Sequence, residues 1–107
     1  IMKNNKYYFL VVIIFINFFF LPVQSDDMFD LGKDIFLNKA ACAACHVLDD
    51  AESNGMIGPN LNEIRPGKDK ILSAVTNGIG VMPAYEGQLT KEEIEAVVEY
   101  VSIAANK

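Results

Sequence analysis

Apolar side chains recur at helical intervals in three stretches of the chain. The stretches run from Asp27 to Asn38, from Lys68 to Thr76 and from Lys91 to Ala104. Their apolar positions are Phe29, Leu31, Ile35 and Phe36; Ile71, Leu72 and Val75; and Ile94, Val97, Val98 and Val101, continued by Ala105. Because spacings of three and four residues place side chains on one face of a helix, these stretches predict three amphipathic helices.

Capping signals stand at the ends of these predicted helices. Thr90 and Glu93 have the spacing of a capping box at the start of the third helix. Asn77 and Gly78 form a stop signal after the second helix, and Asp27 is a candidate cap for the first. The third helix is therefore the most clearly bounded element in the sequence.

The segment from Val47 to Arg65 lacks such periodicity and is rich in Asp, Asn and Gly. We expect it to be mostly irregular, with one short helical turn at Leu61–Ile64. Its acidic residues Asp49, Asp50 and Glu52 are interpreted as a solvated loop. Since no stretch of the chain alternates convincingly between apolar and polar residues, the pattern as a whole predicts a small all-α fold.

The first 25 residues differ in composition from the rest. Lys3 and Lys6 precede an apolar run from Tyr7 to Leu21, and small residues follow at the spacing that a signal peptidase accepts. We expect an export signal that is cleaved after Ser25. The alternative is an uncleaved membrane anchor, because the apolar segment is only slightly shorter than a bilayer span.

Residues 26–107 form one predicted domain of 82 residues, enough for a single small core. The whole chain has a formal net charge of -5, and 7 basic against 14 acidic residues give this domain a charge of -7. Nucleic acid and anionic lipid surfaces are therefore poor partners, whereas a protein with a basic docking patch would be attracted.

The only two cysteines and the only histidine of the chain stand together in Cys42-Ala43-Ala44-Cys45-His46. Two cysteines at this spacing, followed directly by a histidine, form the attachment motif of c-type haem. The thiols would bond to the vinyl groups and the imidazole would bind the iron. The motif therefore predicts one covalently bound haem c.

Three other uses of the cysteine pair remain open. A thioredoxin-like redox pair normally lies in a βαβ sheet, which the sequence does not predict. A structural zinc ion needs a fourth ligand, for which only a carboxylate is available. A plain disulfide would close a very short loop and would leave His46 without a role.

A second candidate ligand is Met82, in the segment Gly80-Val81-Met82-Pro83-Ala84-Tyr85. A haem iron held by one imidazole needs a sixth ligand to carry electrons without reacting with small molecules, and a thioether can supply it. The competing methionines are Met28, expected to be a packing residue, and Met56, which lies in the loop after the histidine. If no methionine binds, the open iron position would suit a gas sensor or a peroxidase-like enzyme.

These motifs, together with Gly58-Pro59-Asn60-Leu61 and a closing helix that contains Tyr100, resemble the class I cytochromes c over essentially the whole of residues 26–107. The segment from Met82 to Tyr85 is most similar to the short soluble cytochromes related to the photosynthetic carrier that can replace plastocyanin. Similar short domains serve respiratory and sulfur-oxidation chains.

The resemblance implies a role for particular residues. Cys42 and Cys45 would form the thioethers, and His46 and Met82 would be the proximal and distal iron ligands. The carbonyl of Pro59 would accept a hydrogen bond from the imidazole and fix its tautomer. In the core, Gly32 and Phe36 of the first helix would meet Tyr100 of the last.

The expected function is one-electron transfer between redox proteins outside the cytoplasm, in a periplasm or a thylakoid lumen. No small-molecule substrate and no nucleic acid partner are expected, and a membrane is involved only if the leader is retained. Electrons would pass through the haem edge near Ala43, Ala44 and the Met82-Pro83 loop. The same domain could instead serve as a membrane-anchored or subunit cytochrome of an oxidoreductase complex.

Overall fold

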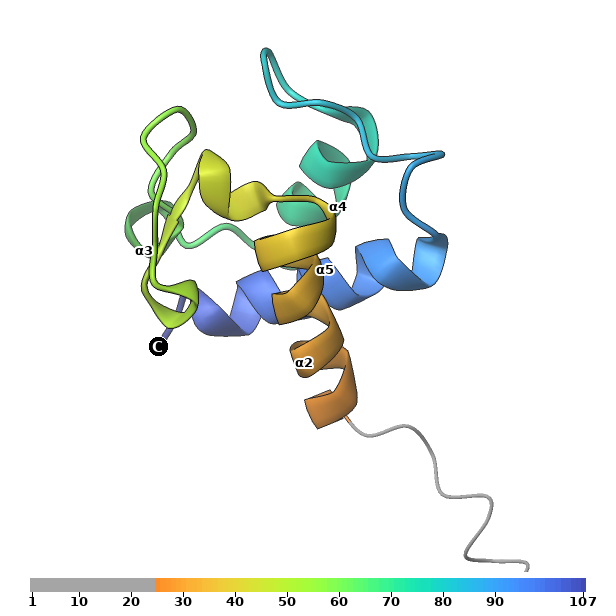
Figure 1. Cartoon of the computed structure of the whole chain (residues 1–107), viewed down its shortest axis with the longest axis horizontal. Coiled ribbons are helices and arrows are strands. Elements are labelled where there is room, and N and C mark those ends of the chain that lie inside the picture. Colours follow the sequence, from red (N-terminus) through yellow and green to blue (C-terminus); the bar gives the residue numbers. More distant parts are fainter. Residues whose placement is uncertain (1–24) are drawn as a thin grey trace, which may run out of the picture.

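A computed structural model describes residues 25–107, in which short helices are joined by loops (Figure 1). The α-helices are α2 (Ser25–Asp34), α3 (Leu61–Ile64), α4 (Lys68–Asn77) and α5 (Lys91–Ala104). The predicted leader lies outside the described residues, apart from Ser25 at its end. Within the part that is described, no helix is both long enough and apolar enough to cross a membrane.

The helices α2 and α5 cross each other at Gly32, as the resemblance to class I cytochromes c implied (Figure 1). A Cβ atom at Gly32 would lie 2.1 Å from the carbonyl oxygen of Ala96 and 2.6 Å from the Cβ of Tyr100. The rings of Phe29 and Phe36 meet the Tyr100 ring edge to face, with centroids 4.9 Å and 5.6 Å away. Only a residue without a side chain permits so close a crossing.

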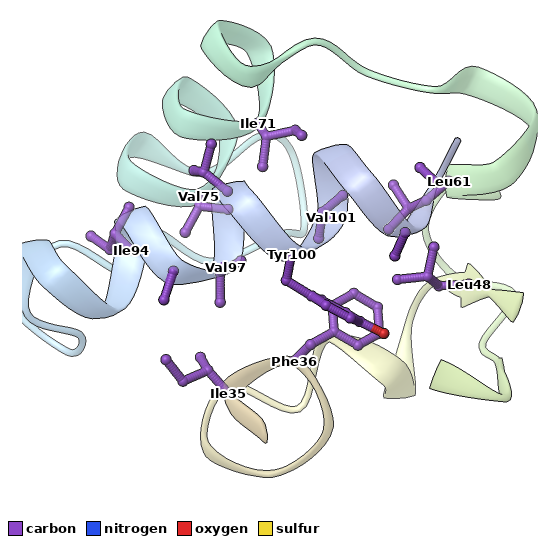
Figure 2. Close-up of a cluster of buried hydrophobic side chains, with 14 of the residues drawn as sticks. Ile35, Phe36, Leu48, Leu61, Ile71, Val75, Ile94, Val97, Tyr100 and Val101 are labelled. Atoms are coloured by element: carbon purple, nitrogen blue, oxygen red, sulfur yellow. The ribbon is translucent and has the colours of Figure 1, made fainter. Parts of the chain in front are cut away.

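The hydrophobic core is built around α5, between the side chains of α4 and those of Ile35 and Phe36 (Figure 2). α5 begins at the predicted capping box, where Glu93 N donates to Thr90 Oγ1 at 3.1 Å and Thr90 N donates to Glu93 Oε1 at 2.9 Å. Two side chains of α4, Ile71 and Val75, pack on this core beside α5. The third predicted helix is confirmed at both ends, and the second extends one residue further than predicted, to Asn77.

The first predicted helix is divided into two parts, which the sequence did not predict. α2 ends at Asp34, and a π-helical turn follows over Ile35–Lys39. The Ala40 N–H therefore donates to the carbonyl of Ile35, five residues back, at 2.9 Å. The predicted cap Asp27 lies inside α2, because the helix already includes Ser25 and Asp26. The π turn buries both Ile35 and Phe36, so it places two consecutive residues in the core.

A small hairpin follows the histidine, within the segment expected to be irregular. Strands β1 (Val47–Leu48) and β2 (Ser53–Asn54) pair antiparallel around a 3₁₀ turn at Asp49–Ala51. Two-residue strands are too short to show an alternating pattern, so they could not be predicted from the amino-acid sequence. The fold class is unaffected, and the predicted turn at Leu61–Ile64 is confirmed as α3.

The acidic hairpin turn is tied to the helix crossing by Asp50. Its carboxylate accepts hydrogen bonds from Tyr100 Oη and Lys107 Nζ, both at 2.9 Å, and lies 3.2 Å from Lys33 Nζ. The interpretation of this turn as a simple solvated loop was therefore wrong for Asp50. Partial burial acts to raise the pKa of Asp50, but the hydrogen bonds from Lys107, Tyr100 and Lys33 outweigh it and hold the pKa below its ordinary value.

Replacing Asp50 with asparagine is expected to lower the free energy of unfolding by about 1–2 kcal/mol at pH 7, because the charged acceptor is lost. Since the pKa of Asp50 is lowered in the folded protein, its contribution is present above the ordinary carboxyl pKa and is lost as the pH falls through the folded value. Denaturant unfolding should therefore show a difference between wild type and Asp50→Asn that shrinks on acidification. Asp49→Asn, at an exposed neighbour, is the control; an equal loss there would contradict this role for Asp50.

Candidate haem site

The cysteines lie in a tight 3₁₀ turn directly after the π turn. Ala41 adopts a left-handed conformation with φ of 53°, which turns the chain into the 3₁₀ segment Cys42–Ala44. The N–H groups of Cys45 and His46 both donate to the carbonyl of Cys42, at 3.0 Å. Both thiols are free and half-buried. The backbone of the motif is thus fixed by local hydrogen bonds, and Cys42 packs against the core.

The His46 imidazole is held by the loop that follows the hairpin. Its Nδ1 lies 2.8 Å from the carbonyl oxygen of Pro59, so Nδ1 must carry the proton and donate it. The opposite nitrogen, Nε2, then has a free lone pair, which is the form of imidazole that binds a metal. A Cβ atom at Gly58 would lie 2.5 Å from Cε1 of the ring. Gly58 therefore allows the loop to pass directly against the imidazole.

The backbone on both sides of the histidine is also fixed. Ser53 is buried, and its hydroxyl donates to the carbonyl of His46 at 2.9 Å. Gly58 N–H donates to the carbonyl of Cys45 at 2.7 Å. A Cβ at Gly55 would lie 2.5 Å from the carbonyl carbon of Cys45, so two glycines are needed for this approach.

Met82 lies in a narrow loop between α4 and α5. Ile79 and Met82 exchange two backbone hydrogen bonds, at 2.9 Å and 3.2 Å. Gly78, with φ of 75°, lies against the returning chain, where a Cβ would be 2.7 Å from the carbonyl oxygen of Met82. Met82 itself is half-buried and packs against the core, as do Cys42 and Ala43. The loop thus returns the methionine to the same core that borders the cysteine turn.

The competing methionines have different surroundings. Met28 packs against the core from α2, which agrees with the packing role expected from the sequence. Met56 is 91% exposed. Of these three methionines, Met82 is therefore the one that lies in a loop and is still half-buried against the core.

The alternative uses of the cysteine pair fit these surroundings poorly. Burial raises the pKa of the Cys42 thiol to about 11, whereas thiols that exchange with disulfides have a lowered pKa. The pair follows a π turn and not a strand of a βαβ sheet. Among residues 25–107, no group of three or more His, Cys, Asp or Glu side chains is placed to hold a metal ion.

A covalently bound porphyrin fits the residues that are present. The donors are two thiols, an imidazole with a free Nε2 and a thioether, which are the groups that haem c uses. Large apolar side chains are exposed on the two loops that carry Gly58 and Met82. A bound porphyrin is apolar and would contact such side chains. They are Met56, Ile57, Ile79 and Val81.

Two contacts of this site had no role in the sequence-based prediction. Gly58 was noted only as part of a motif, and its contact with the imidazole depends on how the loop folds back. Tyr85 was likewise noted without a role, but its hydroxyl donates to the carbonyl of Ala40 at 2.9 Å. No spacing in the sequence signals a hydrogen bond between residues 45 positions apart.

A small helical fold with a Cys-x-x-Cys-His turn and a methionine loop defines the class of c-type cytochromes. The family model described as cytochrome c oxidase, cbb3-type, subunit III matches residues 28–101. Cytochrome c6 of Leptolyngbya boryana is 40% identical over 80 residues, which cover 71% of this chain and 92% of that protein. The cbb3-type oxidase subunit FixP of Bradyrhizobium sp. is 42% identical over 87 residues, covering 76% of this chain but 29% of FixP.

Among solved structures, the c-type cytochrome SorU of Sinorhizobium meliloti is 54% identical and superposes with a TM-score of 0.73, covering 77% of this chain and 95% of SorU. The chain therefore belongs to the cytochrome c family, as a short class I domain with cytochrome c6 among its relatives. Its cofactor is covalently bound haem c, as the sequence predicted. The small all-α cytochrome c fold is confirmed as well.

Proposed function

We propose that the protein is a one-electron carrier in which Cys42 and Cys45 would hold the haem and His46 and Met82 would bind its iron. The observation that carries this assignment is the hydrogen bond from His46 Nδ1 to the Pro59 carbonyl, which directs the lone pair of Nε2 away from the loop. The same bond fixes the tautomer and the orientation of the imidazole. Both effects favour stable coordination in the ferric and the ferrous state.

Coordination by two protein side chains explains why a carrier is favoured over an enzyme. With His46 and Met82 bound, the iron has no free position for a substrate. The haem supplies the redox chemistry when bound, and the chain supplies the ligands, their orientation and an apolar surrounding. A thioether favours the reduced metal, and burial raises the potential further.

The partner contact is proposed to lie where the motif segments approach the surface. Ala44 and Pro83 are exposed, and residues 40–48, 53–62 and 71–85 contain no Asp, Glu, Lys or Arg. Small uncharged side chains allow another protein to approach closely without desolvating charges. The acidic residues lie outside these segments, so they would attract a basic partner over a distance. The contact itself would be uncharged, small and transient, as redox contacts are.

The export pathway completes this proposal. The expected leader and a haem that is attached through two cysteines both indicate a compartment outside the cytoplasm, a periplasm or a thylakoid lumen. We propose that the chain acts there after cleavage following Ser25.

Binding of carbon monoxide to the reduced holoprotein tests the distal ligand. The wild-type spectrum is expected to stay unchanged on addition of the gas, because Met82 occupies the sixth position, whereas Met82→Ala should bind carbon monoxide and have a lower reduction potential. Met28→Leu is the matched control, since it removes the thioether of a methionine that packs against the core from α2. Immediate binding of carbon monoxide by the wild type would contradict the carrier assignment and favour a sensor or peroxidase-like enzyme.

A second candidate function is a cytochrome domain within an oxidoreductase complex. The match to the cbb3-type subunit III model and to FixP favours this alternative. The mass of the protein isolated from its native membrane and soluble fractions separates the two. A chain that begins at Asp26 in the soluble fraction supports a diffusing carrier, and an intact leader in the membrane fraction supports an anchored subunit.

A further inference from the structure

The phenol of Tyr85 connects the methionine loop to the segment that leads into the cysteine turn. Its Oη donates a hydrogen bond to the carbonyl oxygen of Ala40 at 2.9 Å. We propose that this hydrogen bond keeps the Met82 loop closed and thereby sets how readily external ligands displace Met82 from the iron. The inference rests on the proposed function, in which Met82 is the distal ligand.

The other hydrogen bonds of the loop leave it free to move away from the cysteine turn. Tyr85 N–H and Glu86 N–H donate to the carbonyls of Val75 and Thr76 at the end of α4, at 2.9 Å and 3.4 Å. The pairing of Ile79 with Met82 is internal to the loop. In the described part of the chain, the bond from Tyr85 to Ala40 is the only hydrogen bond between residues 78–89 and residues 35–46.

The accepting carbonyl has an unusual position in the backbone. Ala40 ends the π turn, and the next residue, Ala41, is left-handed, so the helix cannot continue and supply a partner for the Ala40 carbonyl. The Tyr85 hydroxyl takes the place of that missing donor. Loss of the hydroxyl would therefore leave an acceptor without its partner in the very segment that positions Cys42.

The donor is available over the whole neutral range of pH. Tyr85 is half-buried and packs against the core, as do Cys42, Ala43 and Met82. Burial raises the pKa of Tyr85, so the phenol stays protonated and can donate. The Tyr85 hydroxyl is therefore both positioned and protonated to donate to the carbonyl of Ala40.

External ligands compete with Met82 only in the fraction of molecules in which the loop is open. The apparent affinity for such a ligand is reduced in proportion to that fraction. Removing one hydrogen bond that exists only in the closed loop is expected to raise the open fraction roughly fivefold. Tyr85 is thus a positioning residue, which acts on the iron through Met82.

Imidazole titration of the ferric holoprotein, followed by absorption, tests this inference. Tyr85→Phe keeps the ring and removes the hydroxyl, and it is expected to bind imidazole roughly fivefold more tightly than the wild type. Tyr100→Phe is the matched control, because it removes a hydroxyl that donates to Asp50 at the helix crossing. The control should bind imidazole as the wild type does, even if it unfolds at a lower denaturant concentration.

Two results would overturn the inference. One is an unchanged imidazole affinity in Tyr85→Phe, and the other is an equal gain in Tyr100→Phe, which would show that general stability and not the Tyr85–Ala40 bond controls the opening. Failure of the underlying function looks different, because a wild type with an open iron position would bind carbon monoxide at once, with no further effect of Met82→Ala.

Discussion

A variant with Cys42 and Cys45 both replaced by alanine is expected to be largely unfolded when it is produced without haem. The core that the chain builds for itself is small and lies mainly along α5, where seven residues are buried. The cysteine turn, the histidine loop and the methionine loop contribute few buried side chains to it. A domain of 82 residues has a marginal core, and a covalently held porphyrin bound in the proposed way would add a large apolar surface and link these three segments.

Far-ultraviolet circular dichroism and thermal melting provide the measurement. The double variant should lose most of its helical signal and melt without a cooperative transition, whereas the wild-type holoprotein should melt cooperatively. Ala44→Ser changes an exposed residue of the same turn and should leave the melt unchanged. Native-like helix content with a cooperative melt in the haem-free double variant would show that the polypeptide folds without its cofactor.

Replacing Gly32 with alanine is expected to have the second largest effect, a loss of about 3 kcal/mol or more in the free energy of unfolding of the holoprotein. The added Cβ would lie 2.1 Å from the Ala96 carbonyl oxygen. That atom belongs to the backbone of α5 and cannot move aside as the end of a flexible side chain can. The two helices would have to separate, and the contacts of both phenylalanine rings with Tyr100 would be lost.

Denaturant unfolding of the ferric holoprotein, followed by circular dichroism, measures this loss. Gly67→Ala is the control, since nothing lies within 4 Å of a Cβ at that position and its φ is -72°. It should cost less than about 1 kcal/mol. A Gly32→Ala protein as stable as the control would mean that the crossing relaxes more easily than the structure indicates.

The elements that the sequence predicted well are those with strong local signals. α5 begins and ends as predicted because a capping box and a long apolar stripe act together within one segment. The π turn over Ile35–Lys39 was missed, since its apolar residues are spaced as in an ordinary helix and the extra residue per turn depends on packing against α5. The hairpin around Asp50 was missed because its strands are short and its ion pairs come from distant residues.

The candidate haem site likewise combines residues with a local sequence signal and residues whose roles depend on contacts between distant segments. Rare residues at fixed spacing, Cys42, Cys45 and His46, could be selected from the sequence because few other chemistries use that pattern. The contact from Pro59 to His46 required knowledge of the family. Gly58 and Tyr85 act through contacts that form only when distant loops meet, so their roles needed the three-dimensional structure.

The π turn between α2 and the cysteines also determines how this motif can be transplanted. A π turn holds about one residue more than an α turn, so converting Ile35–Lys39 into regular α-helix without removing a residue would rotate everything after it by roughly 100° about the helix axis. The thiols would then face a different side of the molecule. A designer who grafts this motif onto an idealised straight helix must therefore count that surplus residue when choosing the length of the leading segment.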